Sequence, residues 1–267
     1  MGCLVSFTPK PEEFQGQAYY FSKSKMELGN WGARMSEAQK KQVYARLKNR
    51  LEKTYVLTFN KTESVFNEED QIDAIAGATD SWGSNFSRGD QYKNVQSNLL
   101  IQSQEFYGKK FLVKDKLQEI NWQMGAETKT IGQYTCFKAT ASVPTSELTW
   151  YDFSWSDLRR PNGDGSSDTA NADNEVPEIE MTEVEAWYTL QVPVSHGPGE
   201  YWGLPGLILE VSAGNTVMLC SKIVMNPKET IQIEAPDKGK EITKSEYQST
   251  IRKKMTEMRD NRGRRRN

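Results

Sequence analysis

The sequence predicts a mainly β fold, either a curved antiparallel sheet or a partly open barrel, with two amphipathic helices. Most of the chain from residue 15 onward alternates apolar and polar residues, which is the period of a half-buried strand. Strands and helices do not alternate regularly, so a parallel βαβ architecture is disfavoured. A chain of 267 residues can bury a full core. We therefore assign residues 15–260 to a single domain.

Roughly nine strands follow from the alternation. They cover residues 17–26, 55–59, 99–106, 109–115, 134–143, 187–192, 207–211 and 216–225, with a short last strand at Ile231 and Ile233. The small residues Ala213, Gly214 and Asn215 form a turn between the seventh and eighth strands, which predicts a hairpin.

Two helices interrupt the strands. Ser36 and Gln39 form a capping box that opens a helix ending near residue 53, and Thr243 and Glu246 open a second one ending near residue 260. Both apolar stripes are narrow and both outer faces are basic. Basic amphipathic helices can lie on anionic membranes, but few large apolar residues are available for insertion. We expect solvated faces, at most peripheral membrane contact, and a basic disordered tail over residues 261–267.

Two segments, 73–90 and 146–181, lack a regular period and read as loops. The second is acidic and is predicted to be a mobile surface insertion. Four of its residues have the spacing of calcium-loop ligands: Asp164, Ser166, Asp168 and Glu175. The position that must turn sharply is not glycine, and no helices flank the segment. We attribute the spacing to the many Asp and Asn residues there and predict no metal site.

Composition and the first residues bear on location. The net charge of -2 gives no reason to expect nucleic-acid binding. No apolar run approaches the roughly 20 residues needed to span a bilayer. Residues 1–14 are interpreted as the remnant of an export signal or a disordered N-terminus. Gly2 and Ser6 also match a myristoylation pattern, and Cys3 could be a lipoprotein cysteine.

Catalytic motifs are scarce in this chain. His196 is the single histidine, so any triad or histidine-based metal or haem site must use it. Its neighbour Ser195 is a poor partner, because adjacent side chains diverge on an extended backbone. The sequence contains no nucleophile elbow, phosphate loop, dinucleotide fingerprint or HExxH motif. We predict no catalytic residue and no cofactor, and a hydrolase that uses His196 with Glu200 stays as an alternative.

The most informative stretch reads Gly-Leu-Pro-Gly-Leu-Ile at residues 203–208. Proline removes a ladder donor, and glycine allows backbone angles closed to other residues. Such a segment suits a sheet edge or corner where the backbone approaches a partner closely. It either turns a curved sheet during folding or forms a binding surface. The candidate binding residues are Tyr201, Trp202, Gly203, Leu204, Pro205 and Gly206.

Cys136 and Cys220 each lie in the middle of a predicted strand. In a cytosolic protein they would be buried thiols. In an exported protein they could form a disulfide worth about 4 kcal/mol in the chain-entropy model. The residues alone leave both alternatives open.

Taken together, these motifs resemble the GLPGLI family of exported Bacteroidetes proteins, from residue 15 to about residue 258. Besides residues 203–208, the resemblance rests on Ile131, Gly132, Tyr134, Cys136, Lys138 and Ala139, and on the segment from Ala186 to Pro198. The family resemblance implies a periplasmic or outer-membrane-associated protein whose signal peptide has lost its start here. It also implies proximity to TonB-dependent receptors, and no established activity.

Three functions therefore stay open. The first is a non-enzymatic envelope protein that binds an outer-membrane or periplasmic protein, such as part of a TonB-dependent receptor system. The second is a periplasmic carrier that holds an apolar ligand in a concave sheet, which the aromatic-rich strands favour. The third is the hydrolase that uses His196.

Overall fold

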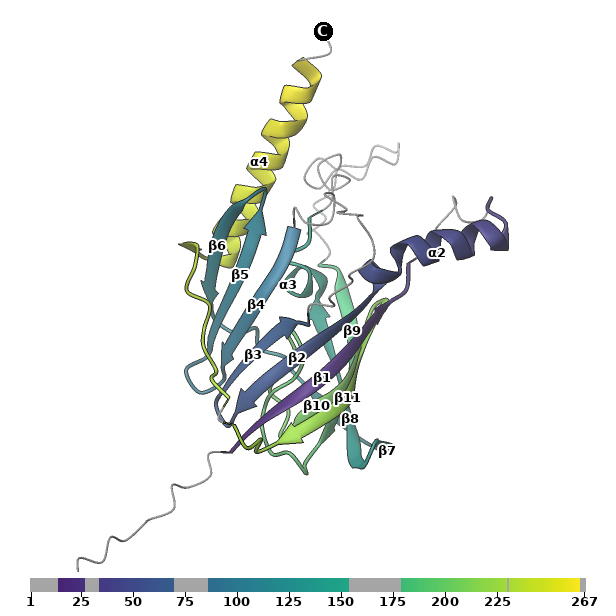
Figure 1. Ribbon diagram of the computed structural model, residues 1–267, viewed down its shortest axis with the longest axis vertical. Helices are drawn as coiled ribbons and strands as arrows, with labels where there is room; N and C mark the ends of the chain where they lie inside the picture. Colours follow the sequence, from purple (N-terminus) through teal and green to yellow (C-terminus); the bar gives the residue numbers. More distant parts are fainter. Residues whose placement is uncertain (1–13, 27–33, 70–85, 154–178, 230, 265–267) are drawn as a thin grey trace, which may run out of the picture.

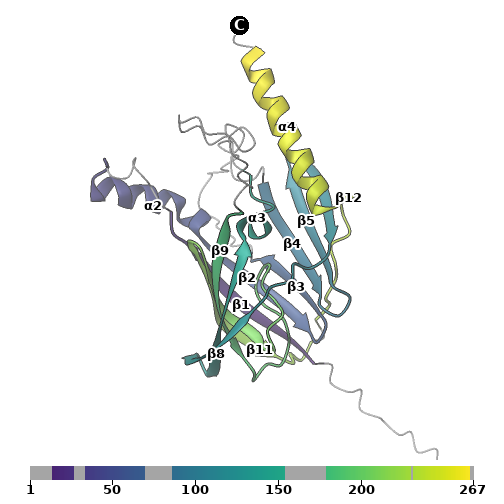
Figure 2. The same ribbon diagram turned by 180° about the vertical axis from the view of Figure 1, so that it is seen from behind.

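The computed structural model describes residues 14–26, 34–69, 86–153, 179–229 and 231–264 (Figure 1). It confirms a mainly β fold with one open, curved sheet of 12 strands in the order β12-β6-β5-β4-β3-β2-β1-β11-β10-β9-β8-β7. Neighbouring strands are antiparallel except β12, which runs parallel to β6. Views from both sides show that the sheet curls until β8 and β9 lie across from β1 and β2 (Figure 2).

The strands are β1 (Gln15–Ser24), β2 (Glu52–Asn60), β3 (Glu63–Glu68), β4 (Phe86–Asn94), β5 (Leu99–Phe106), β6 (Lys109–Asp115), β7 (Gln123–Ile131), β8 (Tyr134–Pro144), β9 (Met181–Thr189), β10 (Leu207–Ala213), β11 (Thr216–Met225) and β12 (Lys240–Ile242). The helices are α2 (Glu37–Leu51), α3 (Thr145–Leu148) and α4 (Lys244–Arg264). The predicted hairpin is confirmed as β10 and β11.

The strand predicted at Ile231 and Ile233 is wrong. The amide of Ile231 donates to the side chain of Gln15, and Ile233 packs against the apolar cluster of Tyr92, Ile101 and Leu112. The alternation of this segment therefore comes from packing on the sheet rather than from ladder pairing. The sequence analysis also did not predict β3, β4, β7 and β12. It predicted the strand of β9 at residues 187–192, whereas β9 covers Met181–Thr189.

Both capping boxes are present. The Ser36 side chain accepts from the Gln39 amide while the Gln39 side chain bonds back, and Thr243 and Glu246 do the same. Helix α4 runs to Arg264, so the tail predicted to be disordered over residues 261–267 begins inside the helix. Among the residues that the structure describes, no helix combines the length and the apolar character needed to cross a membrane.

The predicted mobile insertion begins too early at residue 146. Residues 145–148 form α3, and Trp150 is only 2% exposed in a core cluster with Phe106 and Tyr247. The Trp150 and Tyr247 rings lie 6.0 Å apart at a steep angle. Trp150 lies in a turn, as expected, but it packs under helix α4 and is therefore not part of a mobile surface segment. The calcium-like spacing from Asp164 to Glu175 lies outside the described residues.

Candidate functional site

The Gly-Leu-Pro-Gly motif lies at the end of a loop, residues 190–206, that joins β9 to β10. The loop folds back on itself, with amide-to-carbonyl hydrogen bonds from Gly203 to Ser195 at 3.1 Å and from Leu207 to Val192 at 2.9 Å. We call it the motif loop. Its backbone is thus fixed by its own hydrogen bonds before any side chain is considered.

Two motif glycines are required by this geometry. Gly203 has a φ of 94°, in the region that favours glycine. A Cβ atom at Gly206 would lie 2.1 Å from the carbonyl oxygen of Thr189, so a side chain there would force backbone apart. The folding role that the sequence offered for the motif therefore has a direct structural basis.

The six predicted binding residues divide into two groups. Tyr201, Leu204 and Gly206 are buried, whereas Gly203 and Pro205 are exposed and Trp202 is half-buried. The exposed group adjoins Trp122, whose indole N–H donates to the Trp202 carbonyl oxygen at 2.8 Å. The Trp202 indole donates in turn to the carbonyl oxygen of Gln118 at 2.7 Å. We call Trp122, Trp202, Gly203 and Pro205 the motif surface.

Lys93 on β4 holds the motif loop against the sheet. Its side chain is fully buried, and its ammonium donates to the carbonyl oxygens of Gly197 at 2.8 Å, Gly199 at 2.7 Å and Tyr201 at 3.2 Å. Hydrogen bonds from a charged donor are about twice as strong as neutral ones. The sequence analysis missed Lys93, because a lysine in an unrecognised strand reads as a solvent-exposed residue.

Further polar side chains surround this contact. Gln91, also on β4, donates to the Glu200 carboxylate at 2.6 Å and to the Gln102 side-chain oxygen at 3.1 Å. The indole of Trp150 donates to the same Glu200 oxygen at 3.3 Å. We call Gln91, Lys93, Gln102, His196 and Glu200 the buried polar cluster. It joins strands β4 and β5 to the motif loop.

His196 belongs to this cluster and is completely buried. Its Nε2 lies 3.1 Å from the Asn60 carbonyl oxygen, which can only accept, so Nε2 carries the proton and donates. Burial, aided by the positive charge of Lys93, lowers the pKa of His196 to about 3, while the bond to Asn60 acts in the opposite direction. The imidazole is therefore neutral at physiological pH.

The thiols of Cys136 and Cys220 are both free and buried in the structure. Burial raises the pKa of Cys136 to about 11 and that of Cys220 to about 12. Neither thiol is ionised at neutral pH.

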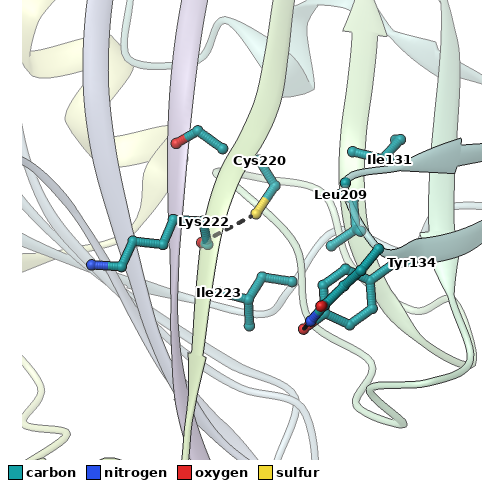
Figure 3. Close-up of a pocket in the computed structure, with 9 residues that line it drawn as sticks. Ile131, Tyr134, Leu209, Cys220, Lys222 and Ile223 are labelled. Carbon is teal, nitrogen blue, oxygen red and sulfur yellow. Dashed lines mark hydrogen bonds between the residues drawn. The ribbon is translucent and has the colours of Figure 1, made fainter.

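A pocket of about 280 Å³ lies apart from the motif surface, between the β7–β8 turn and strands β10 and β11 (Figure 3). Its lining residues are Ile131, Gly132, Gln133, Tyr134, Leu209, Cys220, Ser221, Lys222 and Ile223. Among the residues that the structure describes, no group of three or more His, Cys, Asp or Glu side chains could hold a metal ion.

Comparison with known proteins gives little functional information. A family model described as "Protein of unknown function (Porph_ging)" matches residues 122–210, which include Trp122 and the whole motif loop. No curated protein is similar to the chain. Two crystal structures of PNGF-II, in space groups C2 and P21, are each 14% identical with a TM-score of 0.48. They cover 91% and 89% of this chain, which spans only 32% and 33% of theirs.

Proposed function

We propose that this protein binds another protein of the cell envelope and does so without catalysis. It is exported to the periplasm or the outer membrane, as the resemblance of its motifs to the GLPGLI family implies. The partner is a periplasmic or outer-membrane protein, such as a component of a TonB-dependent receptor system. The contact is made by the motif surface.

The observation that carries this proposal is the rigid support of the motif surface. Lys93 anchors three carbonyl groups of the motif loop, and the indoles of Trp122 and Trp202 are each tied to backbone oxygens. A surface that is already ordered loses little conformational entropy on binding. Tryptophan is also among the residues that most often dominate protein interfaces.

The state of the titratable groups favours binding over catalysis. The imidazole of His196 is buried, neutral and bonded to backbone, which fits a structural role. The Glu200 carboxylate accepts from Gln91 and Trp150. Each of these groups is occupied in holding the motif loop, so the hydrolase alternative gains no support from their geometry.

A carrier of an apolar ligand is the second candidate function. The pocket between the β7–β8 turn and β10–β11 favours it, because Ile131, Leu209 and Ile223 line that space. This function needs no contact with the motif surface.

Chemical crosslinking in intact envelopes, followed by purification of the tagged protein, tests the primary proposal. We expect one crosslinked envelope protein with the wild type, and its loss with Trp202→Ala and with Pro205→Lys. The second variant adds bulk and charge at an exposed position without removing an internal contact. Phe21→Ala is the matched control, since Phe21 on β1 is 41% exposed away from the motif.

Circular dichroism and a thermal melt establish that each variant is folded. Recovery of the wild-type protein alone would contradict the proposal. The same partner captured equally by wild type, Trp202→Ala and Pro205→Lys would contradict the role of the motif surface.

A further inference from the structure

We propose that the pocket between the β7–β8 turn and strands β10 and β11 binds a small, neutral molecule with one or two rings. The inference rests on the carrier function named above, specifies its ligand, and does not depend on the motif surface. Four features carry it: two adjacent β-bulges, a tight turn, a lining whose charged side chain, Lys222, points away, and a fitting volume.

Two β-bulges on neighbouring strands shape one side of the pocket. Leu209 on β10 has no partner on β9, because Ile208 pairs with Tyr188 and Glu210 with Trp187. Ser221 on β11 likewise has no partner on β1. Bulges bend a strand and redirect side chains, and they are common beside functional sites. Both bulged residues line the pocket, so the bend that opens it is built into the strands.

The opposite side comes from the end of the β7–β8 hairpin. Its turn contains Gly132 with a φ of 59°, and Ile131 and Tyr134 pair across it. Figure 3 shows the side chains of Ile131 and Tyr134 near Leu209, with Cys220 and Ile223 across the space. Side chains from β7, β8, β10 and β11 therefore line the pocket, which stays partly open to solvent.

The lining mixes apolar side chains with neutral polar groups such as those of Gln133 and Ser221, and no charge faces the space. Burial keeps the thiol of Cys220 neutral by raising its pKa to about 12. The Lys222 side chain points away from the pocket (Figure 3), and its ammonium lies 5.1 Å from the centre of the Tyr19 ring. At the rim, the Gln133 amide donates to the Tyr134 hydroxyl at 3.3 Å. A charged ligand would lose its hydration without gaining a partner here.

The volume sets the size of the ligand. A dry apolar cavity of about 150 Å³ in a protein can hold benzene. The pocket here measures about 280 Å³, nearly twice as much. It is near the lower end of the usual range for ligand sites, about 300–1,000 Å³. One or two rings, or a branched chain of similar size, would fill it.

Fluorescence titration of the full chain with 2-naphthol, a neutral fluorescent probe of two fused rings, tests the site. We expect saturable binding with one probe per protein. Ile223→Trp fills the pocket and should weaken binding at least tenfold. Val217→Trp places the same side chain at an exposed position on the same strand and should leave binding unchanged. Absence of saturable binding, or equal binding by Ile223→Trp, would overturn the proposal.

A second readout uses the thiols of Cys136 and Cys220 and needs no substitution. Alkylation by N-ethylmaleimide is followed for Cys220 and Cys136 by peptide mass spectrometry, with and without the probe. Because only Cys220 lines the pocket, the probe should lower the ratio of Cys220 to Cys136 labelling several-fold. An unchanged ratio would exclude the site even if the filled variant fails to fold. Partner binding at the motif surface is tested separately by envelope crosslinking. Either experiment can therefore give a negative result without affecting the other proposal.

Discussion

His196 makes the stability of the protein depend on pH in a predictable direction. Its pKa is about 3 in the folded chain and about 6.5 when unfolded, so the unfolded state binds the proton first. The stabilising effect is fully present above pH 6.5 and is lost as the pH falls toward 3. Between pH 7 and pH 5 the free energy of unfolding should decrease by about 2 kcal/mol from this group alone.

The chain has a single histidine, which makes the measurement clean. Urea unfolding of the wild type and of His196→Gln at pH 7, 6 and 5 gives the comparison. The difference between the two proteins should shrink by about 2 kcal/mol over that range. A difference that stays constant with pH would mean that the folded imidazole is not held neutral.

Gly206 should tolerate no side chain. The Cβ atom of Gly206→Ala would meet the Thr189 carbonyl oxygen at 2.1 Å, and Thr189 pairs with Leu207, the next residue along the chain, so the two segments cannot separate without breaking the ladder. We expect a loss of about 3 kcal/mol or more in the free energy of unfolding. Gly125→Ala is the matched control, since its Cβ would lie 3.4 Å from the nearest atom. Equal stability of the two variants in urea would contradict this geometry.

The motif loop depends on β4 through Lys93. Lys93→Met keeps the length of the side chain but leaves the carbonyl oxygens of Gly197, Gly199 and Tyr201 without the ammonium donor. We expect a loss of about 3 kcal/mol in the free energy of unfolding. Hydrogen exchange should also accelerate at the amides of Gly203 and Ile208, which bond within the loop.

Lys114→Met controls for the loss of a lysine. Lys114 pairs with Glu241 at the surface, where its side chain is 41% exposed, so we expect a change below about 0.5 kcal/mol. Unchanged exchange in the motif loop of Lys93→Met would show that the loop holds its shape without this lysine.

The bounds of some strands were predicted correctly from the sequence, whereas other strands were not predicted at all. Residues 99–106, 109–115 and 216–225 form β5, β6 and β11 with the predicted bounds, because apolar residues recur along them, although Phe111, Leu112 and Val113 of β6 are buried on both faces. Strand β4 buries Gln91 and Lys93, so its inward face reads as polar. The edge strand β7 is mostly exposed on both faces and has no alternation to detect. In β4 burial does not follow polarity, and in β7 there is too little burial to leave a pattern.

Prediction of the site was limited by the sequence distance between the motif loop and the residues that support it. The motif itself was found, because glycine and proline mark special backbone positions directly in the sequence. Its support was missed, because Lys93, Gln91 and Trp150 come from segments more than 40 residues away. Only the fold brings them to the motif loop. The pocket could not be predicted either. Whether a residue such as Leu209 lacks a ladder partner depends on strand register, which the sequence does not reveal directly.

Continuity of the sheet decides how the whole molecule unfolds. Strand pairing runs without interruption from β12 to β7, and β1 lies between β2 and the C-terminal strand β11. The buried polar cluster adds a second connection, because Lys93 and Gln91 on β4 hold the loop that leads into β10. The core clusters are separate, but no boundary in the described sheet divides the chain into independent units.

We therefore expect one cooperative unfolding transition, although a chain of 267 residues exceeds the size at which two-state behaviour is usual. Leu57→Ala alters the central cluster on β2, and Ile251→Ala alters the cluster beneath α4; both side chains are fully buried. Each should lower the free energy of unfolding by about 2–5 kcal/mol in the same transition.

Tryptophan fluorescence and far-ultraviolet circular dichroism during urea unfolding provide the measurement. Trp187 lies in the cluster of Leu57 and Trp150 in that of Ile251, so fluorescence reports on both parts. If the ladders and the Lys93 contact couple the two clusters, both probes give one midpoint, and either substitution shifts it. Two midpoints, with Ile251→Ala moving only one of them, would mean that α4 and its strands unfold separately from the part that carries the motif loop.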